Sequence, residues 1–178
     1  MIIETKLINL MFHNQNMALY IEKNKLNNLI DDINYMSNRW RFIFLNTCPE
    51  LNRIFEKRTL HNYLFNQFDR EHLFQNSFMH SISSINFSTE QSYNMKIQLF
   101  LYIILKSLKI QKQMKAKARP LFIIINDFHE FDLKRSIYRD FFHSIINNAS
   151  QCNVRFIFVD NPTQFFNNDD FLKIEKMY

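Results

Sequence analysis

The sequence predicts an α/β domain in which a mostly parallel sheet lies between layers of helices. Short apolar segments rich in Phe and Ile alternate along the chain with longer segments of helical periodicity. Several apolar segments stop abruptly at Asn or Asp, as strands do at the carboxyl edge of a parallel sheet. The chain has 178 residues, 47% of them hydrophobic, so residues 1–178 are expected to form one domain.

The first helix and the first strand are expected near the amino terminus. Residues 17–38 predict one amphipathic helix. The apolar residues of that helix are Leu19, Leu26, Leu29, Ile30 and Ile33. Residues 41–45, RFIFL, form a short apolar segment that predicts a buried strand ending at Asn46-Thr47. Residues 50–75 carry mixed charges and predict helical or irregular structure.

A second strand and a long helix are expected next. Residues 78–88 place apolar residues among small polar ones, which predicts a strand and its turn. Ser88 or Thr89 can cap the following helix, because a side-chain oxygen there accepts a backbone amide of the first turn. The helix is expected to run to about Lys117 and to bury Met95, Leu99, Tyr102, Ile103, Leu105 and Leu108.

The central strand is expected immediately after Pro120, which ends the long helix because it has no amide to donate. Residues 121–125, LFIII, are all apolar and are followed by Asn126-Asp127. A continuous apolar run of this length is typical of a strand that is covered on both faces. This segment therefore predicts the middle of the sheet.

A last helix and a last strand complete the alternation. Residues 136–150 predict an amphipathic helix, and residues 153–165 predict a strand with a polar exit. The helix is expected to bury Ile137, Phe141, Ile145 and Ile146. The strand exits that should meet at the carboxyl edge are Asn46-Thr47-Cys48, Asn126-Asp127 and Asp160-Asn161.

The chain contains no glycine, whereas an average protein has about 7%. Phosphate-binding loops of the types G-x-x-x-x-G-K-[ST] and G-x-G-x-x-G need glycine for their backbone angles and for the close approach of phosphate. Both motifs are excluded, and we expect no nucleotide cofactor.

The net charge of +5 is compatible with nucleic acid or with an acidic partner. Cys48 and Cys152 lie far apart without metal-ligand spacing, so reduced thiols and no metal are expected. The amino terminus lacks a signal-peptide pattern, and the longest apolar run, residues 99–105, is too short for a bilayer. We expect a soluble intracellular protein with no membrane partner.

Four segments resemble the core of the RecA-like recombinases. In order they are RFIFLNTCPE, ISSINFSTEQ, LFIIINDFHEF and VRFIFVDNPTQF. In that family the corresponding strands end in an acidic-Thr-Glu motif, an Asn-Thr-Glu-type turn, Asp-Ser and Asn-Gln. The resemblance covers roughly residues 26–165. It implies a RecA-like three-layer fold with a mostly parallel central sheet.

The chain departs from the family at its nucleotide site. No Walker A loop precedes the helix expected over residues 26–37, and Cys48 falls near the position of the catalytic glutamate. Asp127, which would position water on a magnesium ion, is then interpreted as a strand terminator and helix cap, together with Asn126. In this it resembles the recombinase paralogs without working Walker motifs, such as the ATPase-like subunits of the Shu complex, and the fold is a minimal one without a P-loop.

The resemblance implies a non-catalytic, nuclear pseudo-ATPase subunit. Such a subunit forms a heterodimer with a related paralog and binds single-stranded or forked DNA with weak sequence dependence. It promotes recombinase filament assembly in homologous-recombination DNA repair. Two alternatives stay open. One is a degenerate FtsK/HerA-like ATPase domain that serves a translocation machine, and the other is an enzyme that uses Asp127 and His129.

The resemblance places DNA binding in the loops 132–139 and 161–170. Lys134, Arg135 and Arg139 in the first loop can pair with phosphates, or they can form a solvated helix start. The second loop carries two Asp residues that repel phosphate. Its aromatic residues, Phe165 and Phe166, are better suited to core or partner packing than to base stacking.

A second cationic group closes the long helix. Lys115, Lys117 and Arg119 end a run that also holds Lys106, Lys109 and Lys112. Cations are favoured at the carboxyl end of a helix by its dipole, so a solvated face and a nucleic-acid patch both explain the run. Nucleophilic catalysis finds no support, because the G-x-S-x-G motif cannot occur without glycine and the six His show no informative pairing with Cys or Ser.

Overall fold

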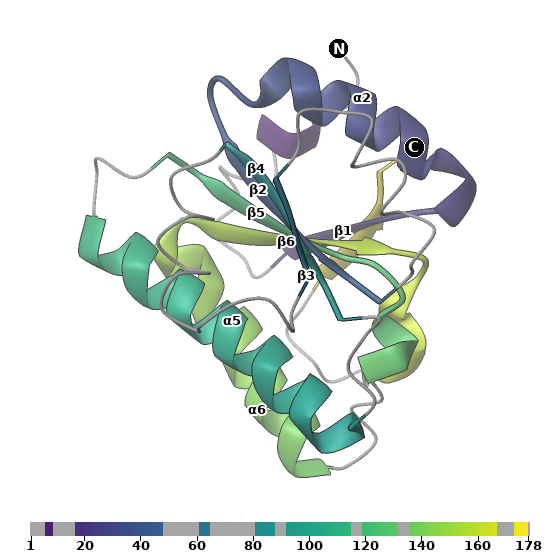
Figure 1. Ribbon diagram of the computed structural model, residues 1–178, viewed down its shortest axis with the longest axis vertical. Coiled ribbons are helices and arrows are strands. Elements are labelled where there is room, and N and C mark those ends of the chain that lie inside the picture. The colour runs from purple at the N-terminus through teal and green to yellow at the C-terminus, as the bar shows by residue number, and fades with distance from the viewer. Residues whose placement is uncertain are drawn as a thin grey trace.

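The computed structural model describes residues 6–8, 17–47, 61–64, 81–87, 92–114, 119–131, 136–166 and 173–177. These residues form a seven-stranded sheet in which every neighbouring pair of strands is parallel. Helix α2 (Leu26–Met36) covers one face, and helices α5 (Tyr93–Met114) and α6 (Ser136–Ala149) cover the other (Figure 1). The α/β class with a parallel sheet is confirmed, and the arrangement is consistent with a three-layer RecA-like fold.

The strands lie in the order β3-β4-β2-β5-β6-β1-β7, so β5 is in the middle, as its apolar run predicts. Their bounds are β1 Met17–Ile21, β2 Arg41–Asn46, β3 His61–Leu64, β4 Ile82–Asn86, β5 Leu121–Ile125, β6 Val154–Val159 and β7 Lys173–Lys176. Short 3₁₀ turns follow three of the strands on leaving the sheet: η1 Lys23–Lys25, η4 Phe128–Phe131 and η6 Pro162–Phe165. A fourth, η5, spans Ser150–Cys152 before β6.

Two hydrophobic cores lie on opposite faces of the sheet. The core under α5 and α6 is rich in aromatic rings, with Phe100 stacked on Phe131 at a centroid distance of 4.1 Å and tilted against Phe142 at 5.6 Å. The core under α2 packs the apolar face of that helix on Phe42 and Phe122, whose rings stack at 5.4 Å. Alternate residues of one strand point to opposite faces, so each central strand supplies both cores.

The helix predicted over residues 17–38 is wrong in its first part. Residues 17–21 form strand β1, which pairs with β6 and β7, and only residues 26–36 form the helix. In β1, Ala18, Leu19 and Ile21 are all buried. The periodicity of a short apolar run does not separate a buried strand from a helix, and here sheet pairing decides the structure.

Burial on α5 and α6 differs from the prediction at four positions. Leu99, Ile103, Leu108, Ile145 and Ile146 are buried as expected, and Tyr102 is half-buried. In contrast, Ile137 is 73% exposed, and Phe141, Met95 and Leu105 are also exposed. Helical spacing identifies an apolar stripe, but it does not tell how wide a part of that stripe the sheet covers.

The edge strands were not foreseen. Residues 61–64 form β3, so the prediction of helical or irregular structure is wrong there, and β7 was not predicted at all. Helix α5 begins at Tyr93, where the Ser92 hydroxyl accepts the amide of Met95 at 3.5 Å. The predicted capping residues Ser88 and Thr89 and the predicted helix end at Lys117 lie outside the described residues.

The aromatic core predicts a sharp difference between two substitutions. We expect Phe100→Ala to lower the free energy of unfolding by about 3–5 kcal/mol, because it leaves a cavity among rings that cannot close it. Ile137→Ala should change it by about 0.5 kcal/mol or less, because that side chain is mostly in water. Urea unfolding of both variants and the wild type checks this. Equal losses in the two variants would contradict the assignment of the core.

Candidate functional site at the carboxyl edge of the sheet

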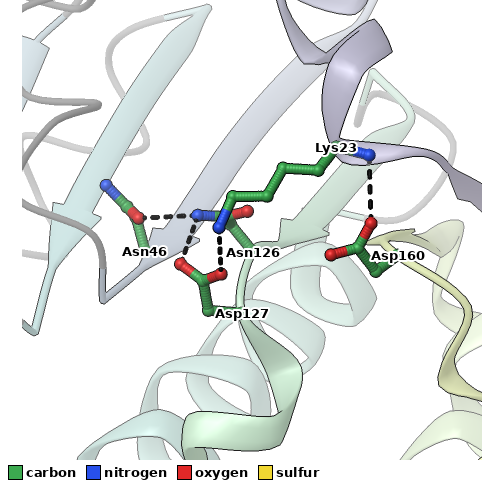
Figure 2. Close-up of polar contacts among 5 residues, drawn as sticks. All are labelled: Lys23, Asn46, Asn126, Asp127 and Asp160. Carbon is green, nitrogen blue, oxygen red and sulfur yellow. Dashed lines mark hydrogen bonds and ion pairs between the residues drawn. The ribbon is translucent and has the colours of Figure 1, made fainter.

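Polar side chains converge where the central strands end, which we call the carboxyl edge (Figure 2). β5 pairs with β2 on one side and with β6 on the other, so the residues that follow these strands come together. Asn46 ends β2, Asn126 and Asp127 follow β5, and Asp160 follows β6. The predicted convergence of the strand exits is thus confirmed for these four residues.

Asn126 joins the ends of two strands. Its Nδ2 donates to Asn46 Oδ1 at 3.0 Å and to Asp127 Oδ2 at 2.8 Å, and all three side chains are buried. The amide must point its two hydrogens at these oxygens, so Asn126 Oδ1 faces away and has no hydrogen-bond partner within the described part of the chain. The two bonds formed by the amide offset the cost of that unpaired oxygen.

Lys23 supplies the positive charge of the site. It lies in η1, directly after β1, and its side chain reaches across the edge so that Nζ is 3.1 Å from Asp127 Oδ1 (Figure 2). The side chain of Asp127 is only 8% exposed, whereas that of Lys23 is 56% exposed. The pair is therefore a buried carboxylate held by a cation that approaches from solvent.

The backbone of the same turn is anchored to the end of β6. The amide of Lys23 donates to Asp160 Oδ1 at 3.0 Å, and the amide of Asp160 donates to the carbonyl of Ile21 at 2.7 Å. Next to it, Glu22 and Lys176 form an ion pair that lowers the pKa of the Glu22 carboxyl and raises the pKa of the Lys176 ammonium. These contacts fix the turn after β1 against β6 and β7.

The turns at this edge use left-handed backbone at residues that are not glycine. Asp127 has a φ of 52° and Asp160 a φ of 68°. Asp and Asn tolerate this conformation better than other residues with a Cβ, because their short polar side chains bond locally. At these two positions a glycine would have no side chain, whereas this chain places a carboxylate at each.

The connection from β1 to α2 leaves no loop for a phosphate. Only Glu22 and the three residues of η1 separate Ile21 from the start of α2. A phosphate cradle needs several converging backbone amides in a wide loop. Here the amide of Lys23 is bonded to Asp160, and its ammonium is on Asp127.

The contacts of Asp127 agree with a structural role, because other residues of the chain hold both of its carboxylate oxygens. One carboxylate oxygen faces the ammonium of Lys23 and the other accepts a hydrogen from the neutral amide of Asn126, so both oxygens have a donor. Asp127 directly precedes η4, and the side-chain contacts described for it are those with Lys23 and Asn126, so the predicted helix-cap role stays a prediction. Within the same residues, no three His, Cys, Asp or Glu side chains lie close enough together to bind a metal ion.

The predicted DNA-binding residues fall at two separate places. Arg119 precedes β5 and Arg139 lies in the first turns of α6, after β5, so these two arginines are at opposite ends of the central strand. Arg139 Nε is 3.9 Å from Asp140 Oδ1. Four predicted residues lie outside the described residues: Lys115, Lys117, Lys134 and Arg135.

Other candidates from the sequence are placed as follows. Phe166 packs in the aromatic core, parallel to Phe128 at 6.1 Å, which confirms the packing role expected of it. The side chain of Phe165 lies outside the described residues, as does Cys48. His129 is exposed on η4, and Cys152 is a half-buried free thiol.

Sequence reasoning missed Lys23, the residue that completes the site. The signal was present, because a lysine follows the apolar run MALYI at a distance of one residue. It was hidden by the assignment of residues 17–38 to a single helix, which places Lys23 on a solvated face. Recognising β1 as a strand puts Lys23 at a strand exit.

Comparison with known proteins assigns no family: no protein-family model matches the chain, and no curated protein matches its sequence significantly. In the described part of the chain, none of the helices combines the length and the hydropathy that a membrane span requires.

The Lys23–Asp127 pair predicts non-additive effects on stability. We expect Lys23→Met and Asp127→Asn each to destabilise the fold, with a coupling energy of about 1 kcal/mol, because the partly exposed ammonium is screened by water. Urea unfolding of the two single variants, the double variant and the wild type measures the coupling. Additive effects would mean that the ion pair contributes nothing to the fold.

Proposed function

We propose that this protein is a non-catalytic subunit of the recombinase-paralog kind, which binds DNA together with a related partner and assists recombinase filament assembly in homologous-recombination repair. One observation carries the non-catalytic part. The acid at the tip of the central strand is neutralised by Lys23 of the same chain, at the place where a nucleotide-binding relative would hold its metal and phosphates.

In this proposal, no residue of the chain binds ATP. An ATPase of this fold needs a glycine-containing loop after its first strand, a lysine that reaches the phosphates and an acid that orients the metal. This chain has the lysine and the acid, but they contact one another, and the loop is one 3₁₀ turn. A protein built this way acts through contact with other molecules.

The surface that we assign to the partner subunit is an apolar groove between α5 and α6. Its volume is about 680 Å³, and its lining includes Leu101, Leu105, Ile137 and Phe141. Large exposed apolar surfaces on soluble domains mark interaction sites. Asp140 also lines the groove, and helical spacing places the exposed Lys109 one turn beyond Leu105. The rim charges fit a partner helix with an apolar centre and charges of both signs at its margins.

The DNA-binding part of the proposal rests on the resemblance of the four strand segments and on the basic excess of the chain. A net charge of +5 attracts phosphate at long range without base specificity. A partner subunit with its own basic surface would extend the contact along a strand. Binding should therefore weaken steeply as salt rises.

Because the proposed subunit binds no nucleotide, we expect calorimetry to detect no heat of binding when Mg²⁺ and ATP are titrated into the protein. We expect the same result for Lys23→Ala, because removing the ammonium does not create a phosphate cradle. Specific saturable binding of ATP by the wild type, lost in Asp127→Asn, would overturn the non-catalytic assignment and favour an enzyme.

We expect this chain to form a stoichiometric complex with a RecA-like subunit. The full chain is purified from its own cells, and the proteins that accompany it are identified by mass spectrometry. Phe141→Glu should abolish the complex, because it places a charge in the groove. Met114→Glu is the matched control on α5, since Met114 is exposed but does not line the groove. Recovery of a translocation machine would favour the FtsK/HerA-like alternative, and a complex insensitive to Phe141→Glu would reject the groove as its interface.

A further inference from the structure

The two edges of the sheet differ in charge. At the amino edge, where the strands begin, the described residues place four arginines: Arg39, Arg41, Arg119 and Arg155. At the carboxyl edge, Glu22, Asp127 and Asp160 are balanced by Lys23, Lys25 and Lys176. A phosphate that approaches this molecule is therefore attracted more strongly to the amino edge than to the carboxyl edge.

Part of the positive charge at the amino edge is fixed inside the protein. Arg41 and Arg155 are buried at the starts of β2 and β6. Burial lowers the pKa of both guanidinium groups, and the charge of Arg119 lowers that of Arg41 further. Arg41 donates to Gln111, which donates in turn to the carbonyl of Arg119 at 2.9 Å. Neighbouring cations that disfavour one another's charge make a favourable setting for an anion.

A pocket opens at the same edge, at the end of α2. Its volume is about 190 Å³, and Tyr35, Met36, Asn38, Arg39 and Trp40 line it. Tyr35 is 81% exposed, whereas Trp40 is buried and packs on Phe122 at a centroid distance of 5.4 Å. The pocket therefore combines a rigid aromatic base with an exposed aromatic side chain and a guanidinium.

The helix dipole does not exclude an anion from this place. The carboxyl end of α2 carries partial negative charge. Arg119 Nη1 lies 3.4 Å from the carbonyl oxygens of Ser37 and Asn38 and donates to both. The guanidinium offsets the negative end of the helix and adds its own charge beside the pocket.

We propose that this pocket is a subsite for one nucleotide of a single-stranded nucleic acid, with the base stacked on Tyr35 and its phosphate beside Arg39 and Arg119. The inference rests on the proposed function and deepens it, because it names the surface and the form of nucleic acid that the protein binds. It also moves the contact away from the predicted loop 132–139.

The chemistry of the pocket selects an unpaired strand. A base in a duplex hides both faces in the stack, so only a single strand can offer a face to an exposed tyrosine. Every base has such a face, which makes the contact tolerant of sequence. The arginines are suited to the phosphate that follows the base, because guanidinium groups bind phosphate oxygens through paired donors.

Trp40 gives a direct readout, because it is the single tryptophan of the chain and lines the pocket. The test titrates oligodeoxythymidylate into the full-length protein at low salt and follows both Trp40 fluorescence and the anisotropy of a labelled strand. We expect the two signals to saturate together. Duplex DNA and thymidine monophosphate serve as probes for the other forms of the ligand, and both should bind much more weakly.

The variants separate stacking from charge. Tyr35→Ala should weaken binding about 5- to 150-fold, the loss expected for one base–aromatic stack, while Tyr35→Phe should bind like the wild type. Arg39→Ala should reduce the slope of log affinity against log salt by about one. Lys25→Ala, an equal loss of exposed charge in η1 at the carboxyl edge, is the control and should leave the Trp40 response unchanged. Because Tyr35 is exposed, its variants should keep the unfolding midpoint of the wild type.

Each negative result has a distinct meaning. If the strand binds but Tyr35→Ala has no effect and Trp40 does not respond, the subsite is wrong and the proposed function stands. If the wild type binds no nucleic acid, alone or with its partner, both are wrong. If the monophosphate saturates the pocket as tightly as the strand, the ligand is a free nucleotide and the proposal fails.

Discussion

Every residue of this chain carries a Cβ, and that constraint shapes the edge at which the strands of a parallel sheet deliver their polar residues. Left-handed turns that glycine would make fall to Asp127, Asn153 and Asp160, so two of the strand exits bring a carboxylate with them. β1 is followed by a single 3₁₀ turn, η1, and the side chain of Lys23 in this turn contacts Asp127 after β5.

The result is a carboxyl edge whose charges satisfy one another. Lys23 and Asn126 occupy the two oxygens of Asp127, while Asp160 holds the backbone of the turn that presents Lys23. The charges that could act on other molecules lie instead at the amino edge. The exposed apolar surface lies on the flank formed by α5 and α6. The molecule is thus a parallel α/β sheet whose polar residues at the carboxyl edge are paired with one another.

The sequence predicted the buried central strands and the two later helices. β2, β5 and β6 were predicted because apolar runs end in Asn or Asp, and the later helices because their periodicity is long. β1 was missed because five apolar residues directly before a helix fit its period. The segments HNYL (residues 61–64) and KIEK (residues 173–176) are edge strands because they pair with β4 and β1, and their polar residues do not predict this pairing. The contact of Lys23 with Asp127 joins distant parts of the chain and depends on the strand order, which no local pattern encodes.

The strand order also has a consequence for how the chain is made. β1 is synthesised before the other strands of the sheet, yet its neighbours are β6 and β7, which are synthesised after the other strands. Until they emerge, the apolar residues of β1 have no strand to pair with, and the core beneath α2 stays incomplete. Sheets with such distant pairings fold slowly and expose apolar surface while they wait. The sheet is therefore completed only after β7 has been synthesised, and until then the nascent segment that contains β1 is a natural substrate for molecular chaperones.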